Sequence, residues 1–438
     1  IILLVGGALF FTIYFGFINI RYFLISINTV RGKYDFLENS KKKDNDEGEV
    51  SHFQALATAV SGTVGNGNIA GVALAIAISG PGATFWMILC GILGMSTKFV
   101  ECTLGVKYRD IGNDGTVYGG PMYYLSKGLK QKGFLKLGKL LAVVFALLCV
   151  GASFGGGNAA QSNQAAMQLV SSFGMTGGNA RTIIGLIMMF VVGIIIIGGI
   201  KRIASVTEKI VPFMALMYVF ACLFIILSNI TYVDDAFGMI FSQAFNPSAG
   251  VGGIIGVLIT GFRRAAFSNE AGAGSASIAH SAVKTNFSAS EGLVALLEPF
   301  IDTVVICTMT ALVIIIFNGD NTVFNYGGEG GIVVINGLEV EGAAITAAAF
   351  SKYISFSGPF LTLAVVLFAI STMISWSYYG LQSWMYLFGK SKISDLIYKL
   401  IFLMFIVIGA AADMSSVWGF SDAMILALVF PNMLGPVS

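Results

Sequence analysis

The stretch Ser61-Gly-Thr-Val-Gly-Asn-Gly-Asn-Ile-Ala-Gly71 lies in the middle of an apolar segment that runs from Phe53 to Ser79. That segment is long enough to cross a bilayer, which takes about 20 helical residues. Because each glycine destabilises a helix by about 1 kcal/mol relative to alanine, the four glycines of the stretch favour unwinding halfway across the membrane. The same stretch holds four polar side chains, Ser61, Thr63, Asn66 and Asn68.

Two interpretations of this stretch compete. Unwound backbone at membrane depth is tolerated only where it lines a cavity or is buried in protein, and broken helices of this kind hold substrate and ions in secondary transporters. The alternative is close helix packing through small residues. The asparagines and the threonine favour the broken helix, because polar groups in hydrocarbon need hydrogen-bond partners. We therefore interpret residues 61–71 as the functional site.

The composition points to a membrane protein without an enzymatic site. Apolar residues make up 56% of the chain and charged residues 11%, and repeated apolar runs of about 20 residues predict a polytopic helical protein. The five cysteines form no metal-type spacing and are interpreted as packing residues. There is no Gly-x-x-x-x-Gly-Lys-Ser/Thr loop, and the two histidines fall in a loop (His52) and near a span end (His280). We infer no organic cofactor, no nucleic acid and no obligate protein partner.

We predict an all-α membrane protein of eleven transmembrane helices. Two interrupted spans, at about 61–68 and 260–270, each open a set of five helices, which is the pattern of an inverted five-plus-five repeat. The predicted order is a peripheral N-terminal helix (1–31), a cytoplasmic loop (32–52), the first repeat (53–230), an extracellular connection (231–249) and the second repeat (250–438), which carries an extracellular insert (318–357) with a hairpin signal at Ile335-Asn-Gly-Leu338.

The distribution of basic residues supports this topology. Of the 25 lysines and arginines, nineteen fall in loops assigned to the cytoplasm, and only Arg181 and Lys352 fall in loops on the opposite side. Cytoplasmic loops of membrane proteins carry such an excess. We therefore expect a multi-pass plasma-membrane protein, surrounded by lipid, with a cytoplasmic C-terminus.

Three motifs resemble the alanine/glycine:cation symporter family, also called the sodium:alanine symporters: Thr63-Val-Gly-Asn-Gly-Asn-Ile-Ala-Gly-Val-Ala73, Gly80-Pro-Gly-Ala-Thr-Phe-Trp-Met87 and Phe267-Ser-Asn-Glu-Ala-Gly-Ala-Gly-Ser275. The resemblance covers nearly the whole chain. It implies the leucine-transporter fold and sodium-coupled uptake of alanine or glycine. Asn66 departs from the family pattern, in which many members have threonine, so substrate preference or stereoselectivity is expected to be sensitive to it.

An amino-acid substrate brings a carboxylate and an ammonium group to the middle of the membrane. We expect the backbone amides of Asn66 and Gly67 to bind the carboxylate, as a helix N-terminus binds an anion. Gly65 would allow close approach of the backbone, and the side chains of Thr63 and Asn68 would add hydrogen bonds. For Asn68, a structural link to a neighbouring helix is an equal alternative.

The third span of the first repeat places Asn158, Gln161 and Gln164 on one helical face. Amides suit a zwitterion because each offers a donor and an acceptor, so we expect at least one to contact substrate and the others to link helices. Three aromatic residues are candidates for the wall of a small apolar pocket, with core packing as the alternative for any one of them: Phe262, Phe267 and Trp376.

A sodium ion prefers several oxygen ligands, many of them neutral. Carbonyl groups freed at the break, those of Ser61 and Val64, would supply some of them. By resemblance to the sodium site shared within the fold, the hydroxyls of Ser371 and Thr372 and the carbonyl of Phe368 would supply the rest. The alternative is that these hydroxyls bond to their own helix.

Charged residues at membrane depth are costly and usually functional. Arg263, Arg264 and Glu270 are therefore interpreted as a gate or a structural ion pair. Lys98 and Glu101 are interpreted as a pair near the surface with no assigned role.

These observations predict a secondary active symporter that works by alternating access. Cation binding would stabilise the broken-helix geometry that binds the amino acid, so each ligand would raise the affinity for the other. One alternative is proton coupling with Glu270 as the carrier. The other is a channel or a receptor-like amino-acid sensor.

Overall fold

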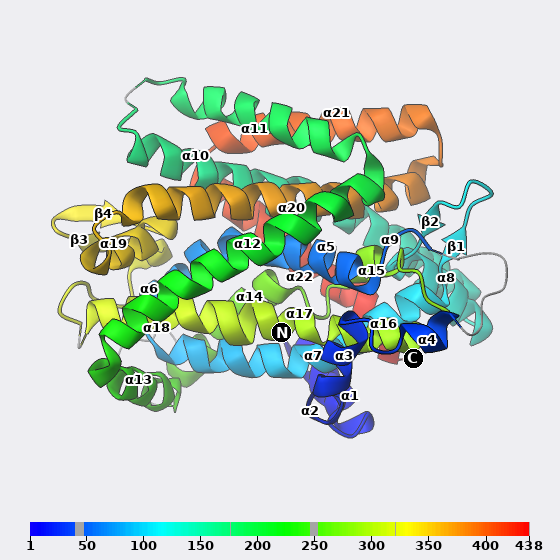
Figure 1. Ribbon diagram of the computed structural model, residues 1–438, viewed down its shortest axis with the longest axis horizontal. Helices are drawn as coiled ribbons and strands as arrows, with labels where there is room; N and C mark the ends of the chain where they lie inside the picture. Colours follow the sequence, from blue (N-terminus) through cyan, green and yellow to red (C-terminus); the bar gives the residue numbers. More distant parts are fainter. Residues whose placement is uncertain (40–47, 176, 246–252, 320, 438) are drawn as a thin grey trace.

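The computed structural model describes residues 1–39, 48–175, 177–245, 253–319 and 321–437. Most of its helices run along the long axis of the molecule (Figure 1). The helices and strands of residues 1–245 are α1 (Ile2–Tyr14), α2 (Ile18–Arg21), α3 (Phe23–Val30), α4 (Asp35–Asn39), α5 (His52–Thr63), α6 (Val72–Ser79), α7 (Gly82–Lys107), β1 (Asp110–Ile111), β2 (Val117–Tyr118), α8 (Pro121–Gln131), α9 (Leu135–Phe154), α10 (Ala160–Ser172), α11 (Ala180–Ile196), α12 (Gly199–Ser228) and α13 (Val233–Phe245).

The remaining elements complete the bundle and its far end. They are α14 (Gly253–Asn269), α15 (Ala276–His280), α16 (Ser288–Ala295), α17 (Leu297–Pro299), α18 (Thr308–Asn318), β3 (Val333–Ile335), β4 (Leu338–Val340), α19 (Ala343–Tyr353), α20 (Ser357–Phe388), α21 (Lys392–Ala411) and α22 (Met414–Val437). π-helical turns at 67–71, 155–159 and 300–307 join α5 to α6, α9 to α10 and α17 to α18.

The predicted all-α membrane class is confirmed. Among the described residues, seven helices are long and apolar enough to cross a membrane, or eight if the bent pair α5 and α6 counts as one span. The helices Ile2–Tyr14 and Ala180–Ile196 are apolar but shorter. Eleven crossings and the inverted repeat therefore stay predictions.

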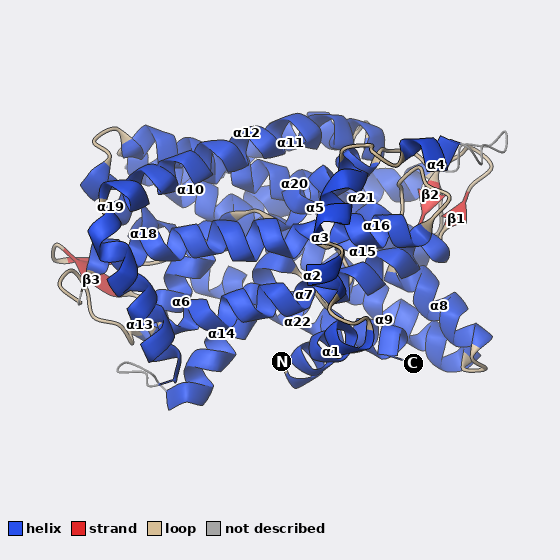
Figure 2. Cartoon of the chain, turned by 60° about the horizontal axis from the view of Figure 1, so that its bottom comes forward, coloured by secondary structure: helices blue, strands red, loops and turns tan. Residues whose placement is uncertain are grey.

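The two ends of the molecule carry different small structures. The β1–β2 pair and α8 lie at one end, and the β3–β4 hairpin, α13 and α19 lie at the other (Figures 1 and 2). The hairpin predicted at 335–338 is confirmed: Asn336 and Gly337 have φ of 53° and 79° and form its turn, as expected for a two-residue connection.

The first predicted interruption is confirmed. Helix α5 ends at Thr63, the next helical turn begins at Gly67, and the two halves of the span are bent by 50°. The apolar segment is thus broken at the point where its glycines and asparagines are concentrated.

The second interruption exists, but its predicted place at 260–270 is wrong. Helix α14 continues to Asn269, and the chain leaves the helix at residues 270–275. Glu270, Gly272 and Gly274 have φ of 55°, 91° and 81°, which ends the helix there. Gly261 serves close packing instead, because a Cβ at this position would lie 2.6 Å from the Ala83 carbonyl oxygen.

The single helix predicted at the N-terminus is divided into α1, α2 and α3. Gly16 and Phe17 have φ of 60° and 59°, which stops α1 and turns the chain. These pieces lie at the periphery of the bundle (Figure 1). The middle of the predicted loop 32–52, including Lys41, Lys42 and Lys43, lies outside the described residues, as do residues 246–252.

A chain of buried ionisable side chains joins five helices near the end that carries α8. Lys98 of α7 donates to Glu298 of α17 at 2.8 Å, and Nε2 of His280 lies 3.8 Å from the same carboxylate. Nδ1 of His280 lies 2.5 Å from Glu291 of α16, whose other oxygen pairs with His52 of α5. We call these five residues the Lys98–His52 chain. It fastens one half of each broken span, α5 and α15, to α7, α16 and α17.

Two expectations are corrected by this chain. Lys98 and Glu101 are not a surface pair: both are fully buried, and Glu101 accepts a hydrogen bond from Asn432 at 2.6 Å. His52 is not in a loop but is the first residue of α5. The partners of Lys98 and His52 lie some 200 residues further along the chain, on α16 and α17.

Removing one member of the Lys98–His52 chain is expected to destabilise the fold. Glu298→Gln leaves Lys98 buried without its ion-pair partner, which costs about 3–5 kcal/mol, and the apparent melting temperature of the purified chain in detergent should fall by several degrees. The double variant Lys98→Met, Glu298→Leu should recover most of the loss.

The matched control is Lys399→Gln on α21. This variant removes a partly exposed pair with Asp395, 2.9 Å long and one turn apart, which is worth about 0–1 kcal/mol. If the Glu298→Gln variant is as stable as this control, the Lys98–His52 chain has no structural role.

Candidate functional site

The break in the first span redirects two backbone amides. The Gly65 amide donates to Oδ1 of Asn68 at 2.9 Å, and the Asn66 amide donates to Oε1 of Gln161 at 3.0 Å. In a continuous helix these amides would bond to the carbonyl groups of residues 61 and 62, four positions earlier. Those carbonyls are released into a fully buried region of the protein. The break therefore leaves two carbonyl groups without their helical donors. The side chains of Asn68 and Gln161 accept the hydrogen bonds of the two freed amides.

Gln161 of α10 is the contact between the third span and the break. Its Oε1 accepts from the Asn66 amide, its backbone carbonyl accepts from Nδ2 of Asn66 at 3.3 Å, and its Nε2 donates to the Gly156 carbonyl at 3.0 Å. The amide oxygen of Gln161 thus occupies the acceptor position that we predicted for a substrate carboxylate. Of the three predicted amides, Gln161 is the one that forms hydrogen bonds to the break.

Asn158 and Gln164 contact other helices. Nδ2 of Asn158 donates to the Phe402 carbonyl of α21 at 2.6 Å, and Nε2 of Gln164 lies 3.3 Å from the sulfur of Met414. Both contacts are the interhelical links that we named as the alternative for this polar face.

Three other predicted residues differ in how close they come to the break. Thr63 donates to carbonyls of its own helix at 3.3 Å, and the ring of Phe262 packs against Trp86 with centroids 5.8 Å apart. Gly67 lies against the Phe267 ring, which an added Cβ would contact at 3.5 Å. Phe267 therefore borders the break, whereas Phe262 packs toward α7.

Helix α20 lies against the break, as the sodium-site prediction requires. A Cβ on Gly65 would lie 2.5 Å from Oγ1 of Thr372, so only glycine fits there. The hydroxyl of Ser61 donates to the Ser371 carbonyl at 2.7 Å, and that of Ser371 donates to the Phe368 carbonyl of its own helix at 3.0 Å. Ser61, Ser371, Phe368 and Thr372 are thus brought together at this contact, next to Val64 in the break. The Ser371 hydroxyl adopts the alternative of bonding to its own helix.

The oxygens at this contact fit a hard cation. Oγ1 of Thr372 is buried and has no hydrogen-bond partner among the described residues. Val64 leaves the helical conformation with ψ of 91°, which turns its carbonyl away from the helix axis. Neutral carbonyl and hydroxyl oxygens are ligands that such cations accept.

Asp302, which the sequence analysis missed, lies beside the same break. It is fully buried, and it accepts from Asn68 Nδ2 at 2.6 Å, Ser268 Oγ at 3.1 Å and Thr303 Oγ1 at 2.7 Å. In the described part of the chain it has no ion pair with a basic side chain. The missed signal was an acidic residue at the start of an apolar run, which membrane proteins rarely tolerate without a function.

Glu270 lies at the second break and links it to α20. It accepts from Nε1 of Trp376 at 2.9 Å and from the hydroxyl of Ser275. Trp376 is thereby oriented at the centre of α20. Within the described residues Glu270 forms no ion pair, so its roles as a gate or as a proton carrier stay predictions.

The two arginines of α14 share one carboxylate on α22. Arg263 pairs with Asp422 at 2.6 Å with a half-exposed side chain, and buried Arg264 pairs with the same oxygen. The Arg264 guanidinium lies 5.5 Å and 5.6 Å from the ring centroids of Phe267 and Trp418, which are 5.0 Å apart. The arginines thus form an ion pair, but its carboxylate is Asp422 and not Glu270. Asp422 and Trp418 are members of this cluster that the sequence did not reveal.

Comparison with known proteins agrees with this geometry. The sequence pattern of the "Sodium:alanine symporter family" matches residues 1–437. The "Sodium/alanine symporter AgcS" of Methanococcus maripaludis is 40% identical over 99% of this chain and 90% of its own length. The "Probable sodium/glutamine symporter GlnT" of Bacillus subtilis is 34% identical over 99% of this chain and 84% of its own length.

A solved structure shows the same fold. MhsT in complex with L-phenylalanine superposes with a TM-score of 0.60 at 15% identity, over 89% of this chain and 88% of its own. The expected leucine-transporter-like architecture is thus supported by structure, and the resemblance stated from the three motifs is confirmed. The chain belongs to the sodium:alanine symporter family, which consists of transporters rather than enzymes.

Proposed function

We propose that the chain is a secondary active symporter that couples uptake of alanine or glycine to sodium by alternating access. The observation that carries this proposal is the break at residues 64–66, where one freed amide bonds to Asn68 of the same span and the other to Gln161 of α10. The Ser61 hydroxyl beside it bonds to α20. A relative named as a sodium/alanine symporter supports it. A relative named as a probable sodium/glutamine symporter supports coupling of an amino acid to sodium.

The substrate would bind where Gln161 now bonds to the break. Its carboxylate would displace Oε1 of Gln161 from the Asn66 amide and use the neighbouring Gly67 amide. Its ammonium group would bind acceptors beside it, which include Oδ1 of Asn66, a buried oxygen without a hydrogen-bond partner among the described residues. Phe267 and Trp376 would limit the space for the substrate side chain, which favours a small amino acid.

Sodium would bind between α5 and α20. The carbonyls of Ser61, Val64 and Phe368 would provide ligands together with the hydroxyls of Ser371 and Thr372. Binding there would hold the break in the geometry that binds the carboxylate, so sodium and amino acid would raise each other's affinity. Arg264 and Asp422, with the Phe267 and Trp418 rings, would close the path on the side of α14, as a gate.

The basic loops suggest the orientation. The end with β1, β2 and α8 carries many of the lysines and would face the cytoplasm, and the C-terminus of α22 would lie on that side. The protein would reside in the plasma membrane.

Proton coupling is the second candidate, and one observation favours it. Glu270 and Asp302 are buried carboxylates without an ion pair among the described residues, and an uncompensated buried charge is costly. Either a cation bound nearby or a proton would compensate each of them.

Ion dependence separates these candidates. The purified chain in vesicles should accumulate radiolabelled alanine above the external concentration when an inward sodium gradient is imposed. This accumulation of alanine should stop when choline replaces sodium, even with an inward proton gradient. Accumulation driven by protons alone would favour the second candidate, and equilibration without accumulation would indicate a channel or a sensor.

Thr372→Ala tests the sodium site. Loss of one hydroxyl ligand should raise the sodium concentration for half-maximal alanine uptake about two- to tenfold, since such a contact is worth about 0.5–1.5 kcal/mol. The control is Ser377→Ala, whose hydroxyl bonds to the Ile374 carbonyl of the same helix and which should leave the sodium dependence unchanged. Unaltered sodium dependence in Thr372→Ala would remove this residue from the site.

Glu270→Gln tests the second break. The amide keeps an acceptor for Trp376 but removes the carboxylate charge, so uptake should fall at least tenfold while the purified variant keeps its elution profile and melting temperature. Ser277→Ala, whose hydroxyl bonds to the Gly274 carbonyl of the same break, is the control. Near-normal uptake by Glu270→Gln would exclude Glu270 from both sodium-coupled and proton-coupled mechanisms.

A further inference from the structure

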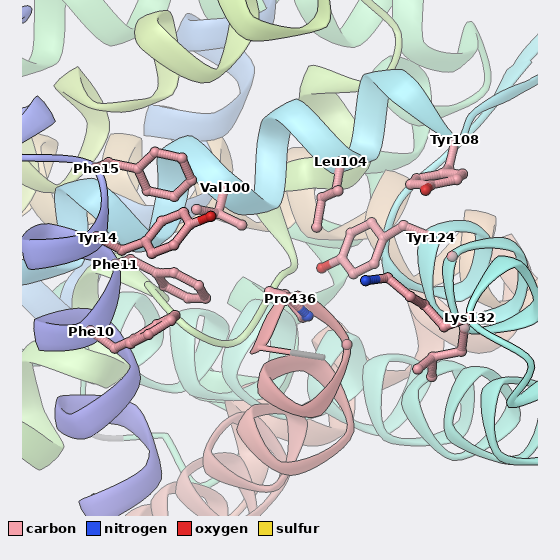
Figure 3. Close-up of a pocket in the computed structure, with 13 residues that line it drawn as sticks. Phe10, Phe11, Tyr14, Phe15, Val100, Leu104, Tyr108, Tyr124, Lys132 and Pro436 are labelled. Carbon is pink, nitrogen blue, oxygen red and sulfur yellow. The ribbon is translucent and has the colours of Figure 1, made fainter.

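A side pocket shares no lining residue with the two breaks. Its volume is about 430 Å³, and it opens between α1, α7, α8 and the end of α22 (Figure 3). Aromatic rings line it from both sides, with Phe10, Phe11 and Tyr14 on α1, and Tyr108 and Tyr124 on the opposite side. We call this cavity the α1–α8 pocket.

The α1–α8 pocket opens toward the surroundings of the bundle. Phe10 and Tyr14 are 46% and 69% exposed, although α1 is one of the most apolar segments of the chain and carries no charge. In a membrane protein such a surface faces lipid. An occupant that enters between these rings must therefore have a long apolar part.

One charged side chain lines the pocket. Lys132 follows the last residue of α8, and Figure 3 shows its amine reaching into the cavity beside the Tyr124 hydroxyl. The sequence around it is basic: no acidic residue occurs between Asp114 and Glu208, whereas Lys130, Lys136 and Lys139 flank Lys132. An occupant with a negative charge next to its apolar part fits this arrangement.

We propose that the α1–α8 pocket binds an anionic phospholipid. Its acyl chain would lie between the rings of α1 and Leu104 of α7, and its phosphate would pair with Lys132 beside the Tyr124 ring. Anionic lipids concentrate where basic residues flank membrane helices, and a lysine among tyrosines at one end of a bundle is placed at headgroup depth. An acyl chain without a headgroup would leave Lys132 without a partner in the cavity.

Bound lipid would contact a residue that leads to the second break. The Tyr124 hydroxyl bonds to Oδ1 of Asn432, and Nδ2 of Asn432 donates to the Gly272 carbonyl at 2.8 Å and to Glu101 at 2.6 Å. One wall residue of the pocket is thus two hydrogen bonds from the unwound segment 270–275. Lipid would also hold α1 against α7 and α8, and so stabilise the folded protein.

Native mass spectrometry of the full chain tests the proposal. The purified protein in detergent is titrated with phosphatidylglycerol or with phosphatidylcholine of the same acyl chains. We expect one phosphatidylglycerol to be retained in preference to phosphatidylcholine and to raise the melting temperature. Lys132→Ala should lower retention of phosphatidylglycerol about fivefold, in line with the contribution of one basic residue to anionic-lipid binding, and should leave phosphatidylcholine unchanged.

Two further variants separate the pocket from its surroundings. Leu104→Trp fills the cavity and should reduce retention of both lipids, whereas Lys136→Ala removes an exposed lysine that does not line it and should have no effect. Equal retention of both lipids by the wild type, or an equal loss with Lys136→Ala and Lys132→Ala, would overturn the proposal. Because the readout is binding, neither result bears on the symport proposal, and a failure of sodium-driven uptake would leave the lipid site standing.

Discussion

The structure depends on how backbone amides are satisfied where no water is available. An unpaired amide in hydrocarbon costs several kcal/mol, so a span can unwind at mid-depth only if other groups replace the helical acceptors. Asn68 does this from within the same span, and Gln161 does it from α10. The break is therefore shared between two spans, and it persists because the third span is packed where its amide can reach Asn66.

The second requirement is that the half-helices on either side of the breaks are held as defined bodies. On the α8 side, the Lys98–His52 chain fastens α5 and α15 to α7, α16 and α17 through buried charges. On the α14 side, two arginines meet one carboxylate of α22. Buried ion pairs contribute little net stability compared with apolar packing, but removing one partner is costly. These ion pairs therefore specify which helices pack together, and they contribute less to the net stability of the fold.

The sequence predicted features that depend on local composition. Glycines and amides inside an apolar run located the first break, and Asn336-Gly337 located the hairpin turn. The predicted position of the second break was wrong because a sequence does not distinguish the roles of glycines. Gly261 allows close packing of helices, whereas Gly272 has a positive φ and ends the helix. Lys98 was misread because its burial is set by Glu298, two hundred positions away. Asp302 is an acidic residue at the start of an apolar run, and the sequence alone marks it as a candidate. The ion pair of Asp422 with Arg264 depends on the packing of α22 against α14, which the sequence does not show.

The place of Gln161 has a kinetic consequence. A carrier has to reorient without cargo in order to complete net transport, and dangling amides at mid-depth would oppose that return step. In the symporter that we propose, the Gln161 oxygen that accepts from the Asn66 amide would supply the missing acceptor in the empty carrier, and the unloaded form would not be destabilised at its centre. Shortening this side chain would slow the empty carrier more than the loaded one, and would shift the protein from net uptake toward exchange of internal for external amino acid.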